Sequence, residues 1–407
     1  MENNLKKNFI WNSVGSTLNA FISLFLLITV VRINGSHQAG YFTIAYAFAN
    51  LLQVICTYSG RPFQVTELNK RFTDSNYFWV KIITSFISVL FLFCYIFIKK
   101  YSGLKFILFI LLFLYRLTDG ISDSFYAIMQ KKGNLYKVGI SLLIKSFLCF
   151  LSFLITDFIF KKITLSVLVM ILANIFVCFF YDFINAKKDG FNLVKIDYEI
   201  VKKIIISGFP VFAFTILIQY LVSAQKYIID DYLTSKYQTI FGIIIMPATV
   251  IVLFSQFIVQ PYLNKISELI DKKENDKLNS LLFKINISIF TMGLLSIFAA
   301  FLLGIPILNF VYNINLNKNK IDLCIILIGA TFFSISYVYS TVLTAFRKTK
   351  IQLYIYLFTS ICSYIISKVL IKYYCIRGAA YAYLISMIIL LILYIIYYLI
   401  ERNLKDE

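Results

Sequence analysis

Long apolar segments, separated by short polar ones, follow one another along the whole sequence. A helix needs about 20 mainly apolar residues to cross the hydrocarbon core of a bilayer. Only helices satisfy their own backbone hydrogen bonds within one such segment, so the pattern predicts an all-α, polytopic membrane protein. Twelve membrane-spanning helices are predicted, at residues 9–31, 39–58, 77–98, 105–127, 138–156, 163–184, 204–229, 239–263, 283–305, 321–346, 351–371 and 377–400.

The twelve predicted helices divide into six and six. The charged segment KKDGFNLVKIDYEIVKK separates the sixth from the seventh and lies near the midpoint of the chain. A repeat of six helices is a common plan of transporters. We therefore expect an N-terminal six-helix bundle at residues 1–190 and a C-terminal six-helix bundle at residues 191–407.

Composition agrees with a membrane protein and excludes several kinds of site. The 407 residues are 60% hydrophobic and 14% charged, whereas soluble proteins are about 45–50% apolar and 25% charged. His37 is the only histidine, so a His-based metal site or a Ser-His-Asp triad elsewhere is excluded. The seven cysteines form no C-x-x-C, and neither a phosphate-binding G-x-x-x-x-G-K-[ST] nor a G-x-G-x-x-G occurs. We expect no metal and no cofactor.

The formal net charge is +19. Lys and Arg are roughly twice as frequent in the segments that would be cytoplasmic if both termini were inside the cell, and cytoplasmic loops of membrane proteins are enriched in them. This predicts that both termini are cytoplasmic. A share of the cations could instead bind an anionic ligand. Lys81, near the start of the third predicted helix, is expected to extend toward the membrane surface.

Polar residues recur along one face of several predicted helices. Asn8, Asn12, Ser16, Asn19 and Ser23 in the first helix have the same spacing as Thr215, Gln219, Ser223, Lys226 and Asp230 in the seventh. Polar faces in a bilayer must meet protein or water. They can serve helix packing alone, or line a shared polar cavity between the two bundles, which is the interpretation favoured here. The candidate cavity-lining residues are Asn12, Asn19, Asn50, Gln53, Gln219 and Ser223.

Ionisable residues interrupt the fourth predicted helix. Arg116, Asp119 and Asp123 are three and four residues apart, so they share one helical face and can pair. Each charge at membrane depth costs roughly 2.5–3.5 kcal/mol on insertion scales, so such residues persist where a partner or a cavity uses them. Lys145, in the fifth helix, lies at a similar depth and could join the same cluster.

Two interpretations of this cluster are open. It is either an internally neutralised ion-pair network that fixes helix packing, or a site whose cations hold an anionic group and whose carboxylates, Asp119 and Asp123, accept a coupling proton or sodium ion. Lys226, near the outer end of the seventh helix, either extends to the interface or binds ligand.

Several motifs resemble those of the polysaccharide (O-antigen and capsule) repeat-unit flippases. The run GRPFQVTE (60–67) resembles a turn of that family that has a basic residue, a glutamine, an aliphatic residue, a hydroxyl-bearing residue and an acidic residue in this order. The run RLTDGISDSFYAIMQ (116–130) resembles the pattern of the family's fourth helix. SLLIK (141–145), KYIID (226–230) and FGIIIMP (241–247) are similar to motifs of its fifth, seventh and eighth helices. GIPILNFVY and TAFRK occur in similar places. Glu67 stands where Asp is commoner in the family. The similarity covers most of the chain.

The resemblance implies membership of the multidrug/oligosaccharidyl-lipid/polysaccharide exporter superfamily. It implies two six-helix bundles in a V, alternating access, and an oligosaccharide on undecaprenyl pyrophosphate as cargo, moved across the cytoplasmic membrane. On this basis Arg116 and Lys145 are the leading candidates for the anionic head group, with Arg61 at the cytoplasmic mouth and Lys226 toward the exit. Membrane lipid and the polysaccharide polymerase machinery are further expected partners, and nucleic acid is not.

Two other functions remain open. A cation-coupled multidrug exporter of the same superfamily would need net acidic charge in its cavity, whereas here the cations within the predicted helices rival the acids. A membrane glycan polymerase would be expected to carry a sizeable outer loop with catalytic residues, and no outer loop in the predicted topology is long.

Overall fold

The computed structural model describes residues 2–65, 72–346 and 348–406, and these contain helices and turns without strands. The prediction of an all-α protein is confirmed. The chain forms two compact units, Met1–Gln219 and Tyr220–Glu407, here called the first and second units.

The first unit consists of the helices that precede the middle of α8. Its elements are α1 (Glu2–Thr57), α2 (Gly60–Val65), α3 (Asp74–Lys99), α4 (Gly103–Lys131), α5 (Leu135–Phe160), α6 (Ile163–Val177), the π-helical turn η1 (Cys178–Phe183), α7 (Ile184–Lys188) and the beginning of α8 (Tyr198–Tyr232).

A break at Gly35 divides α1 into two membrane-spanning halves. Gly35 has φ 82° and ψ 170°, a conformation that glycine adopts without the steric cost a side chain would bring. The break lies between the first two predicted spans, 9–31 and 39–58. Helix α1 therefore contains two of the predicted membrane-spanning helices.

Two glycines bring α1 and α5 into backbone contact. A Cβ atom built on Gly15 would lie 2.0 Å from the carbonyl oxygen of Gly139, and one built on Gly139 would lie 2.2 Å from the carbonyl oxygen of Trp11. Small residues allow helix backbones to approach closely in membranes, where packing is a main source of association. This contact fixes the first half of α1 against α5.

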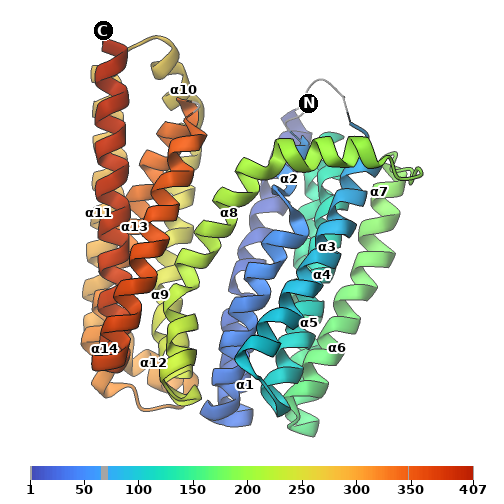
Figure 1. Ribbon diagram of the computed structural model, residues 1–407, viewed down its shortest axis with the longest axis vertical. Coiled ribbons are helices and arrows are strands. Elements are labelled where there is room, and N and C mark those ends of the chain that lie inside the picture. Colours follow the sequence, from blue (N-terminus) through green and yellow to red (C-terminus); the bar gives the residue numbers. More distant parts are fainter. Residues whose placement is uncertain (1, 66–71, 347, 407) are drawn as a thin grey trace. The chain divides into compact units, whose positions relative to one another are not determined.

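The beginning of α8 is attached to the first unit and lies across the end of its helices, near α2, α3 and α7 (Figure 1). The Tyr58 hydroxyl donates to the carbonyl of Ile205 at 2.6 Å, and the Ser59 hydroxyl donates to the carbonyl of Gly208 at 2.7 Å. The ring of Tyr58 stacks on Phe212, with centroids 4.8 Å apart. Packing therefore divides the chain inside α8, after Gln219, rather than in the loop at residue 190.

The second unit contains the end of α8 and all later helices. Its further elements are α9 (Ser235–Val259), η2 (Gln260–Tyr262), α10 (Leu263–Asp271), α11 (Asn275–Ala299), the π-helical η3 (Ala300–Gly304), α12 (Ile305–Tyr312), η4 (Asn317–Asn319), α13 (Lys320–Ala345) and α14 (Thr349–Asp406). Cys375, with φ 50° and ψ −125°, divides α14 into two halves.

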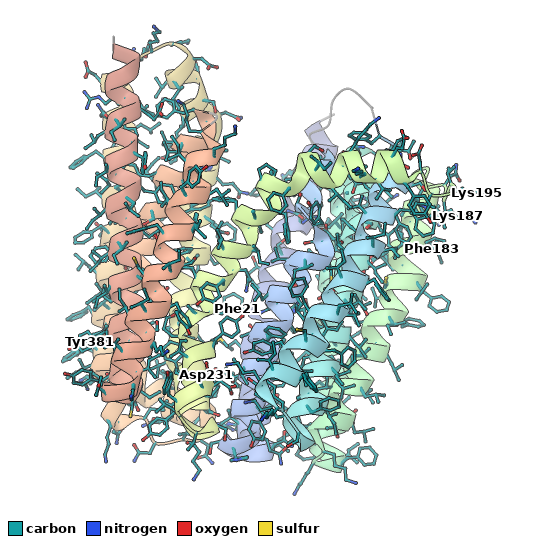
Figure 2. All side chains as sticks on the ribbon, in the orientation of Figure 1. Phe21, Phe183, Lys187, Lys195, Asp231 and Tyr381 are labelled. Carbon is teal, nitrogen blue, oxygen red and sulfur yellow. The ribbon has the colours of Figure 1, made fainter. Side chains whose placement is uncertain are left out.

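Helix α13 is the central helix of this unit and packs against α9, α11 and α14. Gly293 of α11 and Gly329 of α13 allow close approach, since a Cβ on either would lie within 3 Å of Thr331 or Tyr383 side-chain atoms, respectively. The outer surface is apolar and aromatic, as at Tyr381 (Figure 2).

Within the described residues, nine continuous helical segments are long and apolar enough to cross a membrane. Two of these, containing α1 and α14, are each divided in two by the breaks at Gly35 and Cys375. Helix α4 is not among the nine, and its interior holds Arg116, Asp119 and Asp123. The two divided segments supply two spans each, and α4 supplies one more. The predicted architecture of twelve membrane-spanning helices is therefore confirmed.

Candidate functional site

A polar cavity of about 430 Å³ lies within the first unit. Both halves of α1, the middle of α4 and the α8 residue Gln219 contribute to it. Its lining residues are Asn19, Ala20, Ser23, Tyr46, Asn50, Gln53, Val54, Thr57, Arg116 and Gln219. Four of the six residues expected to line a cavity, Asn19, Asn50, Gln53 and Gln219, therefore lie in one place.

Arg116 is held at the wall of this cavity by two partners. Its Nη1 donates to Asp119 Oδ2 at 2.9 Å, and its Nη2 donates to the Tyr46 hydroxyl at 2.5 Å. The guanidinium also lies over the rings of Tyr46 and Tyr115, 4.7 and 5.2 Å from their centroids. Its Nε is buried and has no hydrogen-bond partner among the described residues. The guanidinium is thus fixed in position at the cavity wall, with its Nε enclosed by protein.

Asp119 is itself fixed by the sixth span. The Nδ2 atom of Asn174, a fully buried residue of α6, donates to Asp119 Oδ1 at 3.0 Å and to the carbonyl of Tyr115 at 3.1 Å. Both Asp119 oxygens therefore accept a hydrogen bond. The predicted pairing of Arg116 with Asp119 is present in the structure, with Asn174 as an additional member.

Lys145 lies in a different and nearly closed environment. Its Nζ is 2.8 Å from Asp182 Oδ2 and donates to the Ser122 hydroxyl at 2.5 Å. The Ser141 hydroxyl donates to Asp182 Oδ1 at 2.5 Å and lies 2.8 Å from the Tyr126 hydroxyl. The Lys145 side chain is 5% exposed and that of Asp182 is 0% exposed, so this ion pair is sealed by protein.

The π-helical turn η1 carries Asp182. Such turns insert an extra residue into a helix and occur frequently at functional sites. The turn places one carboxylate in the interior while the neighbouring Phe179 and Phe180 are more than 60% exposed on the outer face. A polar residue in an otherwise apolar span is the sequence signal that could have identified both Asp182 and Asn174.

A third ionic group lies nearer the end of the bundle that carries α2. Lys81 Nζ contacts Asp123 Oδ2 at 2.7 Å, and Arg61 Nε lies 3.8 Å from Asp123 Oδ1. The expectation that Lys81 extends to the membrane surface was wrong, because its side chain is only 3% exposed and is paired with Asp123. Arg61 is the accessible member, with a side chain 29% exposed.

The charges expected to form one cluster therefore form three separate pairings. Arg116 pairs with Asp119, Lys145 with Asp182, and Asp123 with Lys81 and Arg61. Only Arg116 of these residues lines the cavity. Thr66 and Glu67 of the motif that contains Arg61 lie outside the described residues.

The remaining candidates lie elsewhere. Asn12 does not line the cavity, and its backbone lies at the contact between α1 and Gly139. Ser223 and Lys226 belong to the second unit, where Ser223 is buried and Lys226 is partly buried, with no ion-pair partner among the described residues. Their neighbour Gln225 is fully buried and lies 3.4 Å from Ser363.

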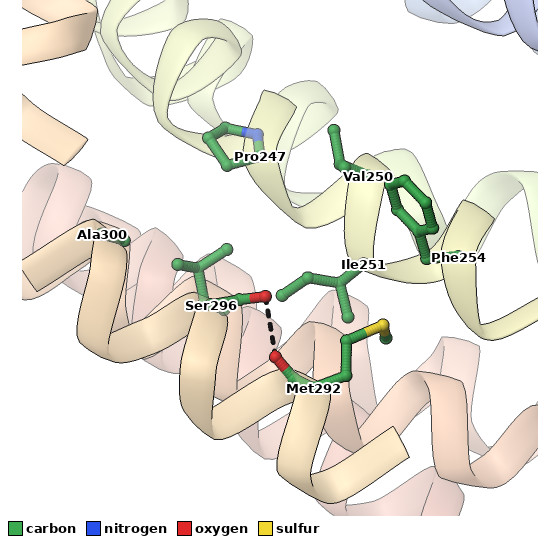
Figure 3. Close-up of a pocket in the computed structure, with 8 residues that line it drawn as sticks. Pro247, Val250, Ile251, Phe254, Met292, Ser296 and Ala300 are labelled. Carbon is green, nitrogen blue, oxygen red and sulfur yellow. Dashed lines mark hydrogen bonds between the residues drawn. The ribbon is translucent and has the colours of Figure 1, made fainter. Parts of the chain in front are cut away.

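The second unit also contains an apolar cavity of about 440 Å³ between α9, α11 and α13 (Figure 3). Pro247, Ile251, Phe254 and Met292 are among its lining residues. The hydroxyl of Ser296 donates to the carbonyl of Met292 at 2.8 Å and is thereby satisfied within its own helix. The chemistry of this cavity contrasts with the amide-rich lining in the first unit.

Comparison with known proteins agrees with this architecture. The sequence is 25% identical over 398 residues to the capsular polysaccharide biosynthesis protein CapF of Staphylococcus aureus, covering 96% of this chain and 98% of that protein. The structure is similar to the lipid II flippase MurJ in an inward closed conformation (TM-score 0.75, 16% identity, 97% of this chain and 89% of the other). It is also similar to an inward-facing multidrug resistance MATE transporter of the MOP superfamily (TM-score 0.72, 11% identity, 95% and 96%).

The chain shares the fold of these two transporters. No family model matches the sequence. The capsular relative and the shared fold agree with the resemblance recognised from the motifs. The cavity of the first unit, with Arg116 at its wall, is the feature from which a function can be argued.

Proposed function

We propose that this protein is a flippase that moves oligosaccharide repeat units, linked to undecaprenyl pyrophosphate, across the cytoplasmic membrane by alternating access. The observation that carries the proposal is the amide-lined cavity with Arg116 at its wall, in a chain whose exterior is suited to lipid. A glycan needs hydrogen-bonding groups inside the membrane, whereas its prenyl tail can stay in the bilayer. The capsular relative and the lipid II flippase neighbour support a lipid-linked saccharide as cargo.

The cations proposed to bind the anionic head group differ in access. Arg61 is partly exposed and shares one carboxylate, Asp123, with Lys81, so two cations meet one carboxylate among the residues that the structure describes. Lys145 is sealed against Asp182. These contacts favour Arg61 as the first contact of the pyrophosphate and favour a packing role for Lys145. Lys226, in the second unit, stays a candidate for the exit side.

The orientation proposed for the membrane follows from the basic residues. Lys187 and Lys195 lie at the end of the first unit where α7 ends and α8 begins (Figure 2). Lys137 is near the same loop, since it pairs with Asp189 at 2.7 Å. Cytoplasmic loops are enriched in Lys and Arg. We therefore place this end, and both termini, in the cytoplasm.

Ion coupling is part of the proposal, with H⁺ or Na⁺ as the ion and no other cofactor. Asp119 and Asp123 are the candidate acceptors of the ion, because each carboxylate lies beside an arginine. Neutralising the carboxylate would strengthen the attraction of that arginine for an anionic ligand. If either couples protons, collapsing the proton gradient should stall translocation in cells or vesicles. A transport rate that is the same with and without both gradients would argue against coupling.

A multidrug exporter is the nearest rival, since the fold alone is shared with such transporters. A cationic drug would need an unpaired carboxylate, whereas Asp119 is already paired with Arg116. The polymerase alternative gains no support from the contacts described here. The two transport functions predict different phenotypes.

The test is deletion of the chain in its host, with complementation. Loss of surface glycan, together with lipid-linked repeat units accumulating on the cytoplasmic face, is the expected result. Unchanged surface glycan with increased drug susceptibility would contradict the flippase and favour the exporter. The complementing Arg61→Gln variant should restore protein level but not full glycan export.

A further inference from the structure

Among the described residues, the positive charge at the polar cavity of the first unit is compensated by a neighbouring carboxylate. Arg116 is the one ionised group among its described lining residues, and Asp119 lies against it at 2.9 Å. The two charges cancel locally. A pyrophosphate carries several negative charges, and moving it from water into a membrane interior needs matching cations, because unpaired buried charge is expensive.

The remaining polar lining groups are suited to hydrogen bonding with a neutral sugar. Asn19, Asn50, Gln53 and Gln219 are carboxamides, and each offers both donors and an acceptor. A sugar hydroxyl or acetamido group also donates and accepts, whereas a phosphate accepts only.

The cavity and the cations that share Asp123 lie at different depths along α4. Asp123, which binds Arg61 and Lys81, is seven residues from Arg116 along α4, a distance of roughly 10 Å at 1.5 Å per residue. In a lipid-linked saccharide the pyrophosphate joins the tail to the first sugar. A pyrophosphate at Arg61 would therefore leave the attached sugars within reach of Asn50 and Arg116.

We propose that this cavity is a subsite for the uncharged, hydroxyl- or acetamido-bearing sugars of the cargo, and that Arg116, whose charge Asp119 already compensates, lies beside a neutral sugar instead of clamping the pyrophosphate. The inference rests on the proposed flippase function. It assigns the pyrophosphate to Arg61 and the sugars to the polar cavity. Asn50 and Gln53 become specificity-determining residues for the glycan.

The experiment measures affinity of the purified full chain in lipid nanodiscs for two probes. One is undecaprenyl pyrophosphate without sugar, and the other is undecaprenyl pyrophosphate carrying a single uncharged N-acetylhexosamine. The sugar should tighten binding by the wild type about tenfold, the effect of one or two net hydrogen bonds. In Asn50→Leu/Gln53→Leu this tenfold gain should disappear, while affinity for the bare lipid stays within about twofold. Asn185→Leu, the same chemical change in α7 outside the cavity, should keep the gain.

A charge-neutral variant tests the role of Arg116 directly. Arg116→Gln/Asp119→Asn removes both charges together and leaves no unpaired ion. Its affinity for the bare lipid should fall by less than about twofold if Arg116 faces sugar, and by about tenfold or more if Arg116 clamps the pyrophosphate. Thermal unfolding of each variant identifies any that are misfolded, in which case Asn50→Leu alone provides the comparison.

The outcomes separate this inference from the function on which it rests. The glycan subsite is overturned if binding of the bare lipid depends on Arg116. It is also overturned if the sugar still tightens binding tenfold in Asn50→Leu/Gln53→Leu. Both results leave the flippase function intact. Failure of the wild type to bind either lipid better than undecaprenol overturns the proposed function itself.

Discussion

Lys145 Nζ lies 2.8 Å from Asp182 Oδ2, and both side chains are buried in the first unit. The two residues come from α5 and from the π-helical turn after α6, 37 positions apart in the sequence. A buried pair of this kind is costly to break, because removing one partner leaves the other charge without compensation.

Asp182→Ala should therefore destabilise the protein by about 3–5 kcal/mol, as removal of one member of a buried ion pair does. Lys145→Met/Asp182→Leu should recover most of this loss, since neither charge remains. Thermal unfolding in detergent gives the stabilities, and surface glycan gives the function. If the double variant is as stable as wild type yet exports no glycan, Lys145 contacts cargo and its packing role is refuted.

Asp123→Asn should also destabilise, by about 3 kcal/mol or more, because Lys81 is buried and would lose its counter-ion. Glu268→Gln is the matched control, since the Glu268–Lys272 pair is 58–59% exposed and exposed pairs contribute little to stability. Chemical or thermal unfolding of both variants under one condition makes the comparison. Equal losses would show that Lys81 is not held by Asp123.

Gly139→Ala should separate α1 from α5, because the new Cβ would lie 2.2 Å from the Trp11 carbonyl oxygen. Overpacking of this kind typically costs about 1–3 kcal/mol. Ser16→Ala, at an exposed neighbouring position of α1, should change stability by no more than about 0.5 kcal/mol. Unfolding temperature and monodispersity after purification report both effects. A fully stable Gly139→Ala protein is incompatible with the close helix contact described above.

Gly208→Ala should weaken the attachment of α8 to the first unit. A Cβ at this position would lie 2.6 Å from the Ser59 hydroxyl oxygen. Adding Ser59→Gly removes that clash and suits the left-handed φ of 63° at residue 59, so the double variant should regain part of the lost stability. Limited proteolysis in the 189–198 loop and unfolding temperature measure the attachment. Ser59→Gly also removes the hydrogen bond from Ser59 to the Gly208 carbonyl, so no rescue would mean that the loss of this bond outweighs the relief of the clash.

Local sequence pattern was sufficient for features that depend on one helix. The i, i+3 spacing of Arg116 and Asp119 predicts a pair on any helix, and the pair is present. The polar spacing in the first two spans indicated that Asn19, Asn50 and Gln53 share an environment, and all three line the cavity. Lys81, by contrast, was misplaced because its partner Asp123 is 42 residues away and does not appear in any local pattern.

The sequence by itself determined the membrane-spanning helices, since the length and apolar character of a segment decide whether it can cross a bilayer. It also determined the residue types available to the interior. Only the tertiary structure decided which charge meets which: Lys145 with Asp182, Asp123 with Lys81 and Arg61, and Arg116 facing the cavity. Those partners lie on different helices, and their distances depend on contacts such as Gly15 against Gly139, which set how closely the helices pack.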